Sequence, residues 1–181
     1  MKAVRLTLVC HALTHAQKTG RFALADDPVL GDAPLLKAVP DGVQVLSAPE
    51  LRARETAAWL GPEVRIETAL ADCGMGHWQG VALKQLQREQ SEALAWWQVD
   101  VDAAPHGGES FAALHKRVAQ WLEAFDTPGD WWAVTHPMVM RAAMVEVLGS
   151  SLGAYQRIDI PPCSRLELSR TEVWRMRLGP A

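Results

Sequence analysis

The chain has 181 residues, of which 49% are hydrophobic and 22% charged, a composition that excludes a disordered protein and favours one globular domain over residues 1–181. The formal net charge of −3 gives no overall attraction to nucleic acid or to an anionic membrane surface, so we expect neither as a partner. The three cysteines form no CxxC pair, which argues against a disulfide framework or zinc ribbon and favours a reducing cytoplasm. No targeting segment and no apolar run of membrane-spanning length is recognisable.

Short apolar, β-branched runs alternate with helical patterns along the chain. Taken in order, the pattern predicts a strand at Val4–Cys10, a short helix around Leu35–Val39, a strand at Val43–Leu46, a helix from Pro49 to Trp59, a strand at Val64–Thr68, one or two helices over Leu83–Val99, an amphipathic helix at Glu109–Phe125, a strand at Trp131–Thr135, a helix ending at Leu148, and a final hairpin of Cys163–Leu168 and Val173–Leu178. This alternation predicts an α/β fold with three layers (α/β/α) and a mostly parallel central sheet.

Two histidines follow predicted strands directly. His11 comes after the first strand and His136 after the fourth, where that strand meets a helix. One such histidine is more often a capping or core residue than a functional one, but two at equivalent places are less easily accidental. In open α/β sheets the functional site lies at the carboxyl ends of the strands, so we expect the two rings to meet there.

A cation and a carboxylate complete this candidate site. Arg52 and Arg54 lie in the first turns of the helix after the second strand, where the helix dipole disfavours cations unless an anion binds. Because they are two residues apart, only one of them can point into a given pocket. Asp72, in a glycine-rich loop, is a candidate acid, although an isolated aspartate there is commonly a turn residue. Two histidines, an arginine and a carboxylate suit phosphoryl transfer through a phosphorylated histidine.

Five motifs in order resemble the histidine phosphatase superfamily, which has the phosphoglycerate-mutase-like fold. The first motif, Arg-His-Gly, aligns with Cys10-His11-Ala12, which Gly20-Arg21 follows. Residues 48–57 align with the family's helix motif Ser-x-Leu-x-Arg-Ala-x-x-Thr-Ala, and residues 70–80 align with its loop Leu-x-Glu-x-x-x-Gly-x-Trp-Glu-Gly. Residues 108–110 match Gly-Glu-Ser, and His136-Pro137-Met138 takes the place of the late His-Gly-Gly element. The resemblance extends over about residues 4–165 and implies the fold and activity of that family.

The resemblance implies a role for each candidate residue. His11 would be the phosphorylated nucleophile, Arg52 and His136 would bind the phosphoryl group, and Asp72 would be the acid and base. Further residues that it places at the substrate pocket are Thr14, Gln17 and Trp78. No cofactor is implied, and the spacing of the histidines and cysteines predicts no metal site.

Several positions depart from the family pattern. Cys10 stands in place of the phosphate-contacting arginine, and a thiol has no guanidinium fork. Asp72 is one methylene shorter than the usual glutamate, Pro137 replaces a glycine, and Gln17 stands where many relatives have asparagine. Arg21 is a candidate substitute cation, as are Lys18 and His15, which lie in the same segment.

These observations leave two main interpretations of the chain. The first is a phosphomonoester hydrolase that acts on a small phosphorylated metabolite through phospho-His11. The second is a catalytically impaired pseudo-phosphatase that binds phosphate or another anion. A dinucleotide site is not supported, since no G-x-G-x-x-G follows the first strand.

Overall fold

A mixed sheet of six strands forms the centre of the protein. The computed structural model describes residues 3–31, 36 and 38–177. The strands lie in the order β3-β2-β4-β1-β5-β6. Their bounds are β1 (Val4–Cys10), β2 (Gln44–Ser47), β3 (Val64–Ile66), β4 (Gly129–Thr135), β5 (Arg165–Arg170) and β6 (Trp174–Arg177). Strands β1 to β4 are mutually parallel, whereas β5 runs antiparallel to both β1 and β6, so the predicted sheet and its closing hairpin are confirmed.

The central strands β1 and β4 bring the two histidines together. β1 lies between β4 and β5, so both of its edges are hydrogen-bonded, and Leu6 and Leu8 are fully buried on one face of the sheet. The strand alternates from Val4 to Leu8, with Arg5 exposed, and is buried on both faces at Val9 and Cys10. Its register pairs Cys10 with Thr135, the last residues of the two strands. His11 and His136 therefore leave the sheet side by side.

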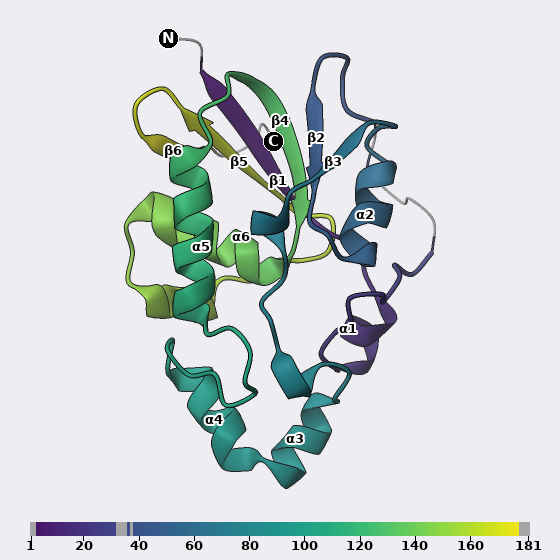
Figure 1. The fold of residues 1–181 in the computed structure, drawn as a ribbon, viewed down its shortest axis with the longest axis vertical. Helices are drawn as coiled ribbons and strands as arrows, with labels where there is room; N and C mark the ends of the chain where they lie inside the picture. Colours follow the sequence, from purple (N-terminus) through teal and green to yellow (C-terminus); the bar gives the residue numbers. More distant parts are fainter. Residues whose placement is uncertain (1–2, 32–35, 37, 178–181) are drawn as a thin grey trace.

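Helices cover both faces of the sheet and extend beyond one end of it. Their bounds are α1 (His15–Thr19), α2 (Leu51–Ala58), α3 (Leu83–Glu89), α4 (Ser91–Val99), α5 (Phe111–Ala124) and α6 (Pro137–Leu148). The connections from β2 to β3 and from β3 to β4 run in opposite directions along the sheet, so right-handed crossovers put α2 on one face and α5 on the other. Helix α6 packs against α5, while α1, α3 and α4 lie beyond the carboxyl ends of β1 and β4 (Figure 1).

Local signals explain where the helices differ from the predicted ones. The short α1 was not predicted; Thr14 and Gln17 form a capping box at its start, and Gly20 ends it in the left-handed conformation with φ 66°. The segment predicted as one or two helices is two, with Gln90 at φ −140° between α3 and α4. Of the short helix predicted around Leu35–Val39, residues 36, 38 and 39 are not helical and the remainder lies outside the described residues.

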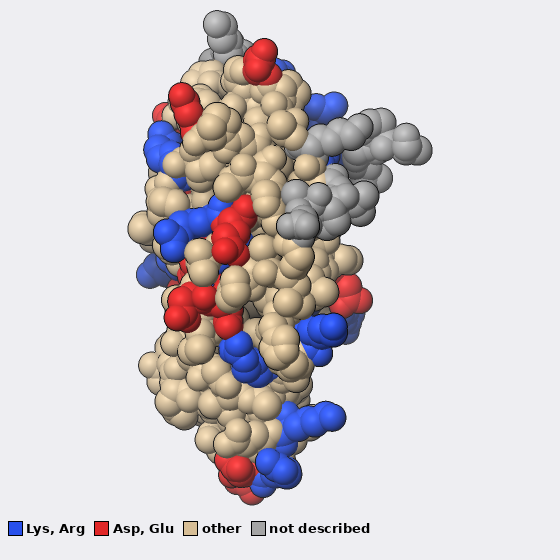
Figure 2. Space-filling view, turned by 90° about the vertical axis from the view of Figure 1, so that its right-hand side faces the viewer, with Lys and Arg blue, Asp and Glu red and all other residues tan. Residues whose placement is uncertain are grey.

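The surface carries both signs of charge. Figure 2 shows acidic and basic side chains side by side on the face that it presents, and no broad basic patch of the kind that binds nucleic acid. Within residues 3–31, 36 and 38–177, no helix is both long and apolar enough to cross a membrane.

Candidate active site

His11 lies at the carboxyl end of β1 with its ring held in one tautomer. Its backbone N–H donates to the carbonyl of Thr135 on β4, and its Nδ1 lies 2.8 Å from the carbonyl oxygen of Ala12. Since a carbonyl only accepts, Nδ1 carries the hydrogen and Nε2 keeps its lone pair. Burial and the neighbouring His136 lower the pKa of His11 to about 4, so the ring is neutral near pH 7. A neutral imidazole with a free Nε2 is suited to attack phosphorus.

Arg52 brings the guanidinium of α2 into the same site. Its side chain is buried, and Nη1 donates to the carbonyl of Leu24 at 2.9 Å while Nη2 donates to Asp72 Oδ2 at 2.6 Å. Arg54, the alternative that the spacing left open, is exposed. Thr56, one turn further along α2, accepts from the N–H of Ala12 at 3.0 Å and donates to the carbonyl of Arg52 at 2.7 Å. This hydroxyl therefore ties α2 to the loop that carries His11.

His136 is the residue before α6 and is completely buried. Its ring centroid lies 5.1 Å from that of His11. Its Nε2 lies 2.7 Å from Glu50 Oε2, and its Nδ1, which has no hydrogen-bond partner, lies 3.4 Å from Asp72 Oδ2. Pro137 occupies the first turn of α6, where a backbone N–H has no helical partner to lose.

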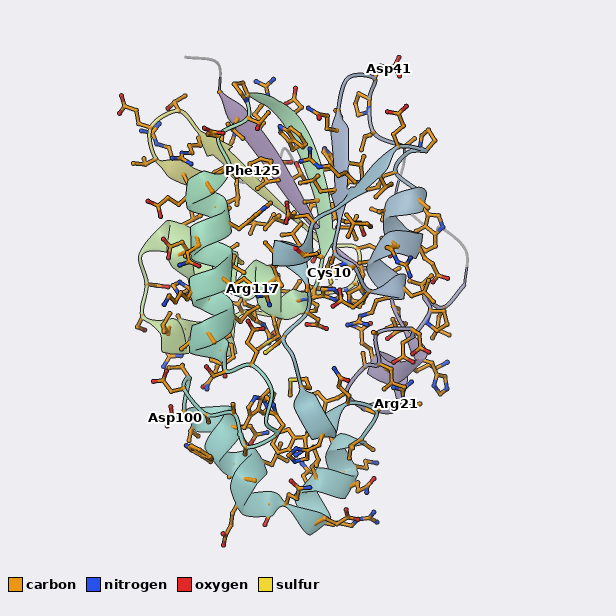
Figure 3. The ribbon with its side chains drawn as sticks, viewed as in Figure 1. Cys10, Arg21, Asp41, Asp100, Arg117 and Phe125 are labelled. Atoms are coloured by element: carbon orange, nitrogen blue, oxygen red, sulfur yellow. The ribbon has the colours of Figure 1, made fainter. Side chains whose placement is uncertain are left out.

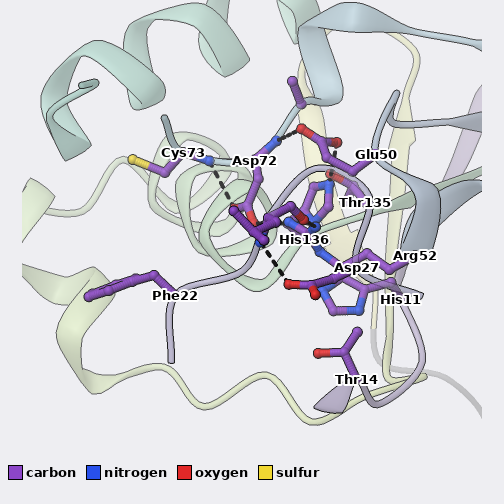
Figure 4. A network of polar contacts seen from close by, with 12 residues as sticks. His11, Thr14, Phe22, Asp27, Glu50, Arg52, Asp72, Cys73, Thr135 and His136 are labelled. Carbon is purple, nitrogen blue, oxygen red and sulfur yellow. Dashed lines mark hydrogen bonds and ion pairs between the residues drawn. The ribbon is translucent and has the colours of Figure 1, made fainter. Parts of the chain in front are cut away.

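Asp72 lies between the arginine and the second histidine. Its Oδ1 accepts from the N–H of Cys73 at 2.8 Å, and Arg117 of α5 holds the preceding loop by donating to the carbonyls of Ala69 and Ala71 at 2.7 and 3.1 Å. Burial raises the pKa of Asp72, but the charges of His136 and Arg52 outweigh it, so that the pKa lies below its usual value. Asp72 is therefore a carboxylate in the unliganded protein, and Figure 4 shows it at the centre of the polar network.

Cys10 adds no charge to this network. Burial, and to a lesser extent Cys163 and Asp72, raise the pKa of its thiol to about 12, so it stays protonated at the carboxyl end of β1 (Figure 3). Of the candidate substitute cations, Arg21 reaches the cavity but is held in an ion pair with Asp27 at 2.6 Å. Lys18 and His15 are exposed and do not line the cavity.

A cavity of about 310 Å³ lies over His11, Glu50, Arg52 and Asp72, whereas His136 is fully buried and does not line it. Its polar lining includes His11, Thr14, Gln17, Arg21, Glu50, Arg52, Asp72 and Gln79, and its apolar lining includes Phe22, Met75, Trp97 and Met138. Trp78, which was predicted to line the pocket, is instead fully buried behind Phe22 and Trp97, where its Nε1 donates to Gln90 at 2.9 Å. Trp97 of α4 lines the cavity instead, whereas its neighbour Trp96 is 50% exposed. Among the described residues, no group of three or more His, Cys, Asp or Glu side chains is placed to hold a metal ion.

Glu50 belongs to the site and was missed in the sequence. Both of its carboxylate oxygens have partners: Oε2 lies 2.7 Å from His136 Nε2, and Oε1 accepts a hydrogen bond from the N–H of Asp72 at 3.1 Å. The available signal was its position two residues before Arg52, where the family's helix motif has leucine. A carboxylate in place of an apolar residue beside a predicted phosphate ligand marks a change in the electrostatics of the site.

Comparison with known proteins agrees with this geometry. The family model described as histidine phosphatase superfamily (branch 1) matches residues 6–176. The glucosyl-3-phosphoglycerate phosphatase of Mycobacterium tuberculosis is 30% identical over 170 residues, which cover 84% of this chain and 76% of that protein.

Two solved structures show the same fold. A putative alpha-ribazole-5'-P phosphatase from Escherichia coli K-12 superposes with a TM-score of 0.81 at 20% identity, covering 97% of this chain and 95% of that one. A mycobacterial glucosyl-3-phosphoglycerate phosphatase in complex with inorganic phosphate superposes with a TM-score of 0.72 at 22% identity, covering 98% and 97%. Their likeness to this chain is a likeness of fold.

Proposed function

The chain belongs to the histidine phosphatase superfamily, and on that basis we propose that it hydrolyses phosphate monoesters of small metabolites through a phosphohistidine at His11. The observation that carries the proposal is the state of His11: Nδ1 donates to the carbonyl of Ala12, which leaves the Nε2 lone pair free in a neutral ring. Arg52 and His136 lie around this ring and are suited to binding phosphoryl oxygens.

In the first step, Nε2 of His11 attacks phosphorus and the bond from phosphorus to the ester oxygen breaks. The leaving oxygen takes a proton from the carboxyl of Asp72. Asp72 is ionised in the unliganded site, where it is paired with Arg52. When a phosphate dianion binds Arg52, the Asp72 carboxylate loses its partner. The negative charge of the phosphate then raises the pKa of Asp72, so that Asp72 binds the proton that it later donates.

In the second step, Asp72 accepts a proton from water, and the oxygen of that water attacks the phosphorus of phospho-His11. The P–N bond breaks, which releases inorganic phosphate and restores the neutral imidazole. Arg52 and His136 stabilise the charge on the equatorial oxygens in both steps. The carboxylate thus acts as acid and then as base.

The cavity supports a small substrate. About 310 Å³ accommodates a phosphoryl group and a leaving group of metabolite size. Phe22 and Trp97 offer apolar surface to that leaving group, and Gln17 and Gln79 offer hydrogen-bonding amides. The relative from Mycobacterium tuberculosis named above is a glucosyl-3-phosphoglycerate phosphatase, which supports the same class of substrate here.

The test is turnover of p-nitrophenyl phosphate by the purified protein between pH 4 and 8, beside His11→Ala. Turnover that disappears in His11→Ala, with phospho-His11 trapped by alkaline denaturation and found by mass spectrometry, supports the proposal. Turnover that is unchanged in His11→Ala overturns it. Absence of turnover in the wild type, with vanadate still bound, also overturns it and supports the pseudo-phosphatase.

A further inference from the structure

Glu50 joins two of the site residues through one carboxylate. Its Oε2 lies 2.7 Å from His136 Nε2, and its Oε1 accepts the N–H of Asp72 at 3.1 Å. The side chain is only 14% exposed and lines the cavity. Burial raises the pKa of this carboxyl, but the hydrogen bond and charge of His136 outweigh it, so that the pKa is lowered and Glu50 is ionised.

We propose that Glu50 is a positioning residue that lets His136 present an N–H to the bound phosphoryl group and that fixes the loop carrying Asp72. The inference rests on the proposed function, since it concerns the same phosphate site. It assigns a role to a residue that the family motif, with leucine at this position, does not provide.

The hydrogen-bonding capacity of the groups carries this inference. A carboxylate only accepts, so His136 Nε2 holds a hydrogen toward Glu50. A neutral ring with its hydrogen on Nε2 has a lone pair at Nδ1, which would repel an anion. With Glu50 behind it, the ring can take a second proton and become a donor at Nδ1, in the way that a buried carboxylate stabilises an imidazolium in other enzymes.

The position of Asp72 marks where a phosphoryl oxygen would bind. Its Oδ2 lies 2.6 Å from Arg52 Nη2 and 3.4 Å from His136 Nδ1, which is buried and has no hydrogen-bond partner. Two groups thus converge on one anionic oxygen in the unliganded site. An oxygen of the substrate that replaces Oδ2 would meet Arg52 and an N–H of His136 together.

The charged groups around His136 come from three parts of the fold. His11 faces it from the end of β1, Glu50 and Arg52 from the start of α2, and Asp72 from the loop after the 3-10 turn Thr68–Leu70. When a phosphate dianion displaces Asp72 from Arg52, Glu50 remains beside the ring as its carboxylate partner. The arrangement supplies a directed donor in a site where Cys10 supplies no guanidinium.

Two substitutions separate charge from geometry. In Glu50→Gln, the amide oxygen can accept the N–H of Asp72 while the amide N–H donates to His136 Nε2, which leaves a neutral ring with its hydrogen on Nδ1. In Glu50→Leu, both bonds are lost. Because removal of one oriented donor typically slows catalysis by about 10²–10³-fold, we expect Glu50→Leu to lower kcat by that factor and Glu50→Gln to lower it by about tenfold. Glu63→Gln, on an exposed loop, is the matched control and is expected to leave kcat unchanged.

The closing experiment combines kinetics with nitrogen NMR of the histidine rings. In the phosphate-saturated protein at pH 7, we expect both ring nitrogens of His136 to be protonated in the wild type and only Nδ1 in Glu50→Gln. A singly protonated His136 in the phosphate-bound wild type overturns the inference, as do wild-type kcat values in both variants. Failure of the proposed function has a different signature, namely turnover that does not depend on His11, and the NMR result decides the inference in that case as well.

Discussion

Replacing Asp72 by asparagine is expected to change phosphate binding and turnover in opposite directions. In the wild type, phosphate must break the hydrogen bond of 2.6 Å between Asp72 and Arg52. A hydrogen bond to a charged group contributes about 1.5–3 kcal/mol. The Asp72 side chain is 29% exposed, so solvent screening reduces this to about 1.5 kcal/mol. The neutral amide of Asp72→Asn would no longer compete as an anion, and phosphate is expected to bind roughly tenfold more tightly.

The same substitution removes the proton donor and acceptor. Turnover of an alkyl phosphate, whose alkoxide needs a proton to leave, should fall by about 10²–10⁴-fold. With p-nitrophenyl phosphate the first step needs little help, whereas hydrolysis of phospho-His11 still needs a base. Asp72→Asn should therefore release a rapid burst of nitrophenol, stoichiometric with the protein, before a slow steady state.

Stopped-flow absorbance measures the burst, and inhibition of turnover by inorganic phosphate measures the binding. Asp102→Asn, an exposed substitution of the same kind, is the control and should behave as the wild type does. Weaker phosphate binding in Asp72→Asn, together with equal losses for the alkyl and aryl esters and no burst, would refute the competition between Asp72 and phosphate and the role of Asp72 as acid and base.

Three further predictions concern His11, Cys10 and Thr56. The His11 ring should titrate near pH 4 by NMR and stay neutral from pH 7 down to about 5, because burial and His136 lower its pKa; a midpoint near 6.5 would contradict this. Cys10→Arg should raise kcat/KM for p-nitrophenyl phosphate by about tenfold or more, since it adds a guanidinium beside His11. An equal or lower kcat/KM, in a variant with the melting temperature of the wild type, would mean that another cation already binds the phosphoryl group. Thr56→Val should lower the free energy of unfolding in urea by about 1–3 kcal/mol, because the N–H of Ala12 loses its buried acceptor, and an unchanged midpoint would show that the N–H finds another partner.

The sequence was most informative where local chemistry decides the structure. The apolar β-branched runs before His11 and His136 predicted two buried strands, and parallel pairing then placed the two rings together. The five-residue α1 escaped prediction because its capping box and terminal Gly20 act over too few residues to produce a periodic pattern.

Other features depend on contacts between distant segments. Glu50 and His136 are 86 residues apart, and no pattern within α2 shows that the carboxylate faces a histidine rather than solvent. Trp78 and Trp97 are equally apolar in sequence, and only the turn of α4 decides which indole reaches the cavity. The choice of Arg52 over Arg54 depends likewise on which face of α2 packs on the sheet.

The pairing of opposite charges in the cavity affects how a substrate arrives. Arg52 faces Asp72, and Arg21 faces Asp27. Fields from such close pairs cancel within a few ångströms, and at physiological ionic strength the Debye length is only about 8 Å. A phosphorylated metabolite is therefore not steered from a distance, and its association rate should vary little with added salt. The discrimination in favour of phosphate then begins at contact, when the incoming anion exchanges with a carboxylate that already occupies its place.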